Sequence, residues 1–126
     1  MKILEKHVEQ HVVDRARKLG AIVVKQTHAG ARSHPDRAFY FPGGQLLQIE
    51  FKAPGELPTK LQAQTIAALT KLGFDVQVID NREQGIALVE YVATRGLPSP
   101  ASFRAFTLVA VDVALAKAAP VKKRRK

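Results

Sequence analysis

The chain has 126 residues, of which 46% are hydrophobic and 25% charged, a balance that fits one globular domain rather than a disordered chain. It contains no cysteine, which excludes disulfide bridges and thiolate metal sites, and no apolar run approaches the roughly 20 residues that span a bilayer. The formal net charge is +9, and such a surplus favours a polyanionic partner through counterion release.

An amphipathic helix is predicted over residues 4–19, because apolar residues recur there at three- and four-residue spacing. Gly20 follows as a natural C-terminal stop, and the β-branched content of residues 21–27 favours a strand. Residues 28–35 then form a predicted loop. The apolar positions expected to face the core from this helix are Leu4, Val8, Val12, Ala16 and Leu19.

Two apolar segments around a glycine-rich turn predict a β-hairpin over residues 36–41 and 45–52, joined at Pro42-Gly43-Gly44. Side chains alternate along a strand, so residues of equal parity share a face. The odd-numbered face carries five large apolar side chains, and we expect it to pack in the core. Its members are Phe39, Phe41, Leu47, Ile49 and Phe51.

The even-numbered face of the hairpin carries Asp36, Glu50 and Lys52. A three-residue turn pairs residue 41 with residue 45, and this register places Asp36 opposite Glu50. Two carboxylates that close repel unless a cation joins them, and a divalent metal is the natural candidate. Two interpretations stay open at this point: a metal site that hydrolyses a phosphodiester with help from Lys52, or a solvated strand end at which Lys52 neutralises both carboxylates.

A second helix is predicted over residues 59–72, where Thr59 is the cap and Gln62 can complete a capping box. A strand over 74–79 and a helix over 81–94 follow. Because the helix over 59–72 separates the strand over 74–79 from the second hairpin strand, we expect these two strands to be parallel, connected by a right-handed crossover. The result is an α/β fold with a mixed sheet flanked by helices. Core positions expected in the two helices are Leu61, Ile66, Leu69, Leu72, Ile86, Val89 and Val92.

The C-terminal part of the chain follows no such pattern. Residues 103–118 are apolar and fit either one helix or a strand with a short helix. We predict that residues 97–119 form an extension that packs on the core or on a second subunit. Residues 120–126 form a basic tail, predicted to be disordered, whose last five residues are all Lys or Arg.

The stretch HPDRAFYFPGGQLLQIEFKAPGELPTKLQ, residues 34–62, resembles a VRR-NUC domain of the PD-(D/E)xK nuclease superfamily, in its minimal phage or bacterial stand-alone form. The resemblance covers roughly residues 5–90 and implies a restriction-endonuclease-like core, with the order α-β-β-β-α-β, over residues 1–96. The matching residues are Pro35, Asp36, Arg37, Pro42, Gly43, Gly44, Glu50, Lys52, Ala53, Pro54, Gly55, Gln62 and Gly73.

This resemblance implies a Mg²⁺- or Mn²⁺-dependent endodeoxyribonuclease. Asp36, Glu50 and the backbone carbonyl of Phe51 would hold the metal, and Lys52 would assist the nucleophile. Gln62 would lie near the scissile phosphate or support Lys52, in addition to its capping role.

The family also has a carboxylate on the first helix that reaches the metal directly or through water. Glu9 is the best match, because it precedes Gly20 by eleven residues, as in related junction resolvases. Glu5 lies one turn away on nearly the same face and is the competitor.

Arg32 and Arg37 flank Asp36 in the sequence and are candidates for phosphate contacts, together with Lys60. Ser33-His34 stands where family members often have a small residue and Val before Pro35-Asp36, and His34 could contact phosphate or act in proton transfer.

The expected substrate is branched DNA such as a Holliday junction, cut by a homodimer, with no organic cofactor and no membrane partner. An intracellular location is the simplest interpretation: the cytoplasm or nucleoid, or the host cytoplasm for a phage-encoded protein. The alternatives are a non-catalytic nucleic-acid-binding module, a flap or nicking nuclease, and an RNA-directed nuclease.

Overall fold

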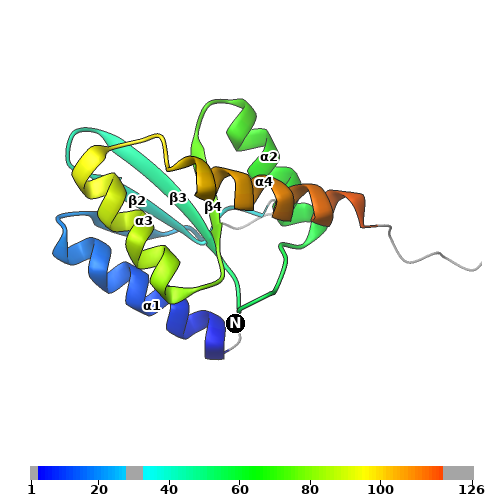
Figure 1. Ribbon diagram of the computed structural model, residues 1–126, viewed down its shortest axis with the longest axis horizontal. Coiled ribbons are helices and arrows are strands. Elements are labelled where there is room, and N and C mark those ends of the chain that lie inside the picture. Colours follow the sequence, from blue (N-terminus) through cyan, green and yellow to red (C-terminus); the bar gives the residue numbers. More distant parts are fainter. Residues whose placement is uncertain (1–2, 28–32, 118–126) are drawn as a thin grey trace, which may run out of the picture.

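The computed structural model describes residues 3–27 and 33–117. Two earlier predictions, the contact from Arg32 and the tail over 120–126, lie outside the described residues. Within them, eight elements follow one another along the chain (Figure 1). They are α1 (Ile3–Lys18), β1 (Ile22–Lys25), β2 (Arg37–Phe41), β3 (Gln45–Phe51), α2 (Lys60–Lys71), β4 (Asp75–Ile79), α3 (Arg82–Arg95) and α4 (Ala101–Ala116).

The four strands form one mixed sheet in the order β1-β2-β3-β4. β1, β2 and β3 are successively antiparallel, whereas β4 lies parallel to β3, which confirms the predicted crossover through α2. In the hairpin, Phe41 pairs with Gln45 and Arg37 with Ile49, the register that a three-residue turn implies. Gly43 and Gly44 make this turn possible, since their φ angles of +85° and +75° are unfavourable for residues with a side chain.

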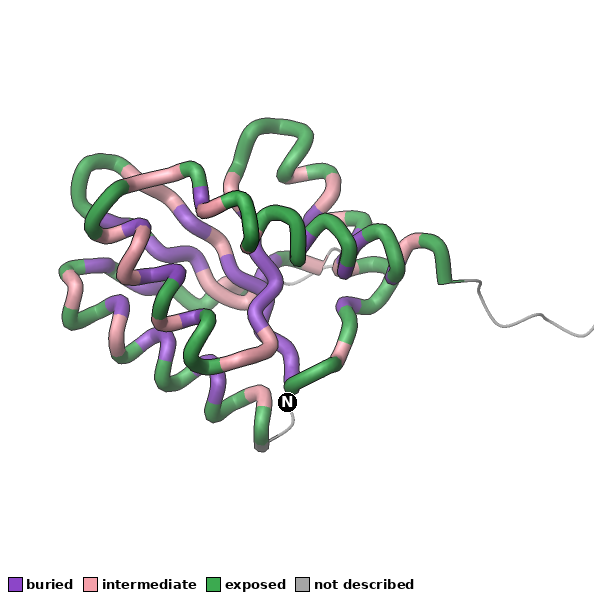
Figure 2. Tube along the Cα trace, viewed as in Figure 1, coloured by how far each residue is buried: buried purple, intermediate pink, exposed green. Residues whose placement is uncertain are grey.

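Helices cover the sheet in two pairs. α1 and α3 pack against each other and on the odd-numbered face of the hairpin, and α2 packs with α4 beside β4 (Figure 1). The main core lies between the first pair and the sheet, and all five odd-numbered hairpin residues are buried in it, as predicted. Figure 2 shows the buried residues along the central strands and on the helix faces turned toward them.

Close packing between α1 and α3 depends on Gly85. A Cβ atom at this position would lie 2.4 Å from Cγ2 of Val12 and 3.0 Å from Cγ2 of Ile79. A side chain here would therefore push α3 away from both α1 and β4. Because α1 also carries Glu5 and Glu9, this contact helps to fix the first helix relative to the end of β3.

For the segment 103–118 a helix or a strand with a short helix stayed open; its residues 103–116 lie in one helix, α4. α4 runs beside the free edge of β4. Thr107 Oγ1 accepts a hydrogen bond from the Val78 amide (3.0 Å) and donates one to Gln77 Oε1 (2.6 Å). The helix thereby covers a strand edge whose backbone groups would otherwise lack partners.

Three leucines predicted to face the core are exposed instead: Leu4 by 61%, Leu61 by 48% and Leu72 by 73%. The buried residues of α2 are Ala63 and Ile66, so Leu61 lies outside the face that contacts β4, and Leu72 is the C-cap beyond the helix. The periodicity of apolar residues marks a stripe along a helix, but the neighbouring elements cover only part of that stripe.

No helix in the described ranges is long and apolar enough to cross a membrane.

Candidate active site

The hairpin register brings two carboxylates together at the end of β3. Asp36 immediately precedes β2, and Glu50 is the second-last residue of β3, so the pairing continued by one step sets them opposite each other. Their side chains hydrogen-bond to each other, and Asp36 Oδ2 also accepts the Phe51 amide at 2.8 Å. Glu50 is 1% exposed and Asp36 is half-buried, so this acidic pair does not lie at a solvated strand end.

Burial dominates the ionisation of the pair. It raises the pKa of Glu50 to about 8; the neighbouring Asp36 carboxylate raises it further, and Lys52 acts in the opposite direction. Burial also raises the pKa of Asp36, against the Phe51 amide, which favours the ionised form. In metal-free protein, burial therefore favours a pair that holds a proton at neutral pH.

Lys52 completes this cluster. Its ammonium nitrogen lies 3.8 Å from Glu50 Oε2, and the residue is 7% exposed. A buried lysine needs an anionic neighbour, and the carboxylate pair is that neighbour. Backbone hydrogen bonding to β4 fixes the position of Lys52, because its amide donates to the Ile79 carbonyl at 2.9 Å.

The first helix contributes two carboxylates to the same end of the sheet, near where the chain leaves β3 (Figure 1). Glu9 is 5% exposed and accepts a hydrogen bond from Arg37 Nε at 2.5 Å. Glu5 is partly buried, and its pKa is raised by burial while Lys52 lowers it. The charge of Glu9 contributes to the raised pKa of Asp36, and the charge of Glu5 contributes to the raised pKa of Glu50.

The Arg37 side chain points toward Glu9, and the hydrogen bond from its Nε connects β2 to α1.

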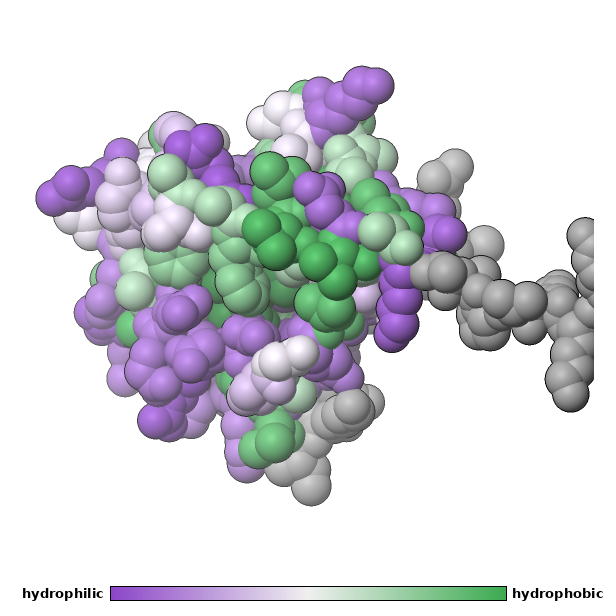
Figure 3. Space-filling model, turned by 45° about the vertical axis from the view of Figure 1, so that its right-hand side comes forward, coloured by the Kyte–Doolittle hydropathy of each residue, from purple (hydrophilic) through white to green (hydrophobic). Residues whose placement is uncertain are grey.

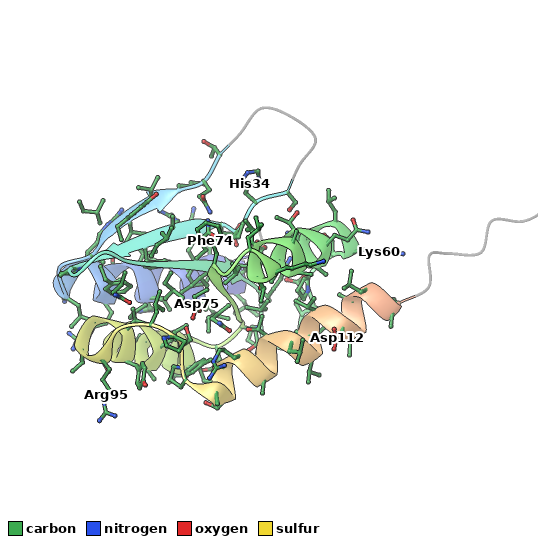
Figure 4. All side chains as sticks on the ribbon, turned by 90° about the horizontal axis from the view of Figure 1, so that it is seen from above. His34, Lys60, Phe74, Asp75, Arg95 and Asp112 are labelled. Carbon is green, nitrogen blue, oxygen red and sulfur yellow. The ribbon has the colours of Figure 1, made fainter. Side chains whose placement is uncertain are left out.

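Gln62 is half-buried and forms the predicted capping box at the start of α2. Its Oε1 accepts a hydrogen bond from the Thr59 amide at 2.9 Å, and the Gln62 amide donates to Thr59 Oγ1 at 3.1 Å. His34 and Lys60 are exposed, His34 on the segment that enters β2 and Lys60 at the start of α2 (Figure 4).

Two glutamines beside the acidic pair were not singled out from the sequence. Gln26 Nε2 donates to the Pro35 carbonyl at 2.9 Å, and Gln48 Nε2 lies 3.4 Å from Gln26 Oε1. Gln48 Oε1 is buried and has no hydrogen-bond partner among the described residues. Gln48 shares its parity with Glu50, and that alternation is the signal that places it on the same face of β3.

The donors at this site suit a hard divalent cation. Among the described residues, no three His, Cys, Asp or Glu side chains are grouped so that they could hold a metal ion. The available oxygen donors at this site are the Asp36 and Glu50 carboxylates and nearby backbone carbonyls. Mg²⁺ typically uses one or two carboxylates and keeps several waters, which matches this set. A cation could also replace the proton that the pair otherwise needs.

The comparisons with known proteins agree with this fold. The chain is 41% identical over 81 residues to "Putative nuclease p44" of Acyrthosiphon pisum secondary endosymbiont phage 1, an overlap that covers 64% of this chain and 87% of that protein. Its structure matches a solved VRR_NUC domain with a TM-score of 0.66 and 25% identity, over 71% of this chain and 98% of that domain. No model of a protein family matches the sequence.

The fold and these likenesses define a nuclease with a restriction-endonuclease-like core. The chain belongs to the VRR-NUC family of nucleases, as its sequence motifs predicted.

Proposed function

We propose that this protein is a divalent-metal-dependent endodeoxyribonuclease that hydrolyses phosphodiester bonds in branched DNA, such as Holliday junctions, as a homodimer. The pairing of half-buried Asp36 with buried Glu50, beside buried Lys52, carries the proposal. A module that only binds DNA has no use for two opposed carboxylates, which are costly to bury and would repel the phosphate backbone.

Asp36, Glu50 and the backbone carbonyl of Phe51 would hold Mg²⁺ or Mn²⁺. When bound, the ion supplies Lewis-acid polarisation of a phosphoryl oxygen. Glu50 must give up its proton to act as a ligand, and Asp36 is held in place by the Phe51 amide. The Lys52 ammonium would orient the attacking water and stabilise negative charge that develops on the phosphate. No side chain becomes covalently attached, so no serine or cysteine nucleophile is required.

Gln62 would support this arrangement from the start of α2, where its cap bond fixes its side chain. Phosphate contacts would come from His34 and Lys60, which are exposed, and from Arg32. Arg37 would reach phosphate only through its terminal nitrogens, because its Nε is bonded to Glu9.

The carboxylate from the first helix is proposed to be Glu9, held by Arg37, with Glu5 as the competing residue. Glu9→Gln should raise the Mn²⁺ concentration that gives half-maximal cleavage by roughly tenfold or more, and Glu5→Gln should raise it less. A metal titration of cleavage for both variants measures this difference. A larger effect of Glu5→Gln would transfer the role to Glu5.

A cleavage panel tests the function as a whole. It contains a four-way junction, a flap, a splayed duplex, a linear duplex, single-stranded DNA and an RNA hairpin, each with Mg²⁺, Mn²⁺ or EDTA. We expect cleavage of the four-way junction with either metal and none with EDTA. Cleavage in EDTA would refute metal dependence, preference for RNA would refute the substrate class, and salt-sensitive binding without any cleavage would identify a binding module.

A further inference from the structure

α4 carries far more apolar surface than the monomer covers. Its buried face consists of Thr107, Ala110, Val111 and Ala114. Outside this face, Leu108 is exposed by 61% on the side of α4 that lines the groove toward α2. Phe106, Val109 and Val113, exposed by 40%, 61% and 47%, lie on another side of the helix. Figure 3 shows hydrophobic surface gathered on the side of the molecule along which α4 runs. A helix that is apolar around most of its circumference normally has partners on more than one side.

A groove between α2 and α4 adjoins this surface. It has a volume of about 440 Å³, and its wall includes Ile66, Phe74, Leu108 and Leu115. Phe74, one of these residues, is 46% exposed. Exposed apolar surface of this kind, next to a hollow, is typical of a protein–protein contact.

The charges on α4 indicate what covers it. In a protein of net charge +9, residues 101–116 contain one basic residue, Arg104, and one acidic residue, Asp112, and are therefore neutral. Nucleic acid would find no electrostatic attraction here. Two copies of this helix, in contrast, could approach without the repulsion that their basic bodies would produce elsewhere.

Arg104, Leu108 and Asp112 follow one another at four-residue spacing, so they form a single row along α4, with Leu108 at its middle. All three are exposed and line the groove. Arg104 Nε donates to the Ser99 carbonyl at 2.8 Å, and its terminal nitrogens have no hydrogen-bond partner within residues 3–27 and 33–117. Among the described residues, the Asp112 carboxylate (Figure 4) has no hydrogen-bond or ion-pair partner.

We propose that α4 packs antiparallel against α4 of a second copy, about a two-fold axis at Leu108. This symmetry sets Leu108 against its own counterpart and each Arg104 against Asp112 of the other copy. One row thus supplies an apolar centre and two identical ion pairs, the self-complementary pattern of an isologous interface. The existence of a homodimer belongs to the proposed function; the surface and its pairing are the new inference.

Sedimentation velocity at micromolar concentration tests the apolar centre. Wild-type protein is expected to be dimeric, and Leu108→Asp to be monomeric at the same concentration, with its dissociation constant raised by at least roughly a hundredfold. Leu108 is 61% exposed, so the variant should fold, which its thermal unfolding checks. Ile22→Asp is the matched control: Ile22 is 69% exposed on β1, at the other edge of the sheet, and should leave the dimer intact.

Charge exchange tests the pairing itself. Arg104→Glu and Asp112→Arg should each weaken the dimer by roughly tenfold or more, because each sets like charges together twice. The double variant should recover the dimer, and a mixture of the two single variants should form a heterodimer. Arg17→Glu, on the exposed side of α1, controls for the change in net charge.

Three outcomes would overturn the proposal: a wild-type monomer, a dimer that survives Leu108→Asp, or single charge variants that the double variant does not rescue. Sedimentation does not depend on cleavage, so this inference and the proposed activity can fail separately. A dimer that does not cleave DNA would refute the proposed activity but not the α4 interface. An active protein that remains dimeric with Leu108→Asp would refute only the interface.

Discussion

Lys52→Ala is expected to reduce cleavage of the preferred DNA by roughly a thousandfold or more, with little change in DNA affinity. The reason is the position of the ammonium group, which lies 3.8 Å from Glu50 and is buried; in the proposed mechanism it would act at the reacting phosphate rather than on the DNA surface. Removal of one preorganised charged donor typically costs about 10²–10³ in rate, and loss of water activation adds to this. Single-turnover cleavage and equilibrium binding in Ca²⁺ measure the two effects separately.

Lys18→Ala is the matched control, because Lys18 is an exposed lysine at the end of α1 and should leave the rate unchanged. Lys52→Arg retains the positive charge, but the larger, planar guanidinium group does not fit the space that the ammonium group occupies. We therefore expect this variant to recover at most part of the cleavage rate. A Lys52→Ala protein that folds and still cleaves at the wild-type rate would remove Lys52 from the mechanism.

The metal-free protein should become less stable as pH rises from about 5 to about 8. Burial raises the pKa of Glu50 from 4.5 to about 8, so in this window the folded state keeps a proton that the unfolded state releases. The stabilisation is complete below the unfolded pKa and is lost as pH rises through the folded one. The loss is on the order of 4 kcal/mol in the free energy of unfolding, and the raised pKa of Asp36 acts in the same direction.

Urea unfolding in EDTA at several pH values measures this slope. Glu50→Gln should remove most of it and make the protein more stable than wild type at pH 8, because the amide resembles the protonated acid. Glu83→Gln is the control, since Glu83 is fully exposed and lies at the start of α3. An unchanged slope in Glu50→Gln would show that another group holds the proton.

Metal binding should reverse this dependence. A cation favours ionised Glu50, so binding near pH 7 should release a proton, and affinity should rise toward pH 8. Calorimetry of Mn²⁺ binding in buffers of different ionisation enthalpy would detect the proton, and Glu50→Gln should bind weakly without releasing it.

Much of the hairpin site could be predicted because its determinants are local. Strand alternation separates Glu50 and Lys52 from Ile49 and Phe51, and a three-residue turn sets the register that puts Asp36 opposite Glu50. The capping box of Thr59 and Gln62 is equally local, since all its atoms lie within one helical turn. The motifs that surround these residues were also enough to predict the family.

Other features depend on which elements meet. Glu9 and Glu5 share a helix face, and only the packing of α1 on the sheet brings Glu9 to Arg37 and leaves Glu5 near Lys52. The burial that raises the pKa of Glu50 likewise comes from neighbours distant in sequence.

The C-terminal segment shows the same division. Its apolar composition fitted either a helix or a strand with a short helix, and it did not predict the position of the segment beside β4. Contacts from Thr107 to Gln77 and Val78, about thirty residues away, decide that place. The sequence by itself therefore determined the fold class, the family and the Asp36, Glu50 and Lys52 set, because alternation and turns act over a few residues. Tertiary structure alone decided the partners of the first-helix carboxylates, the burial of the acidic pair and the free face of α4, because contact and desolvation depend on the whole packed chain.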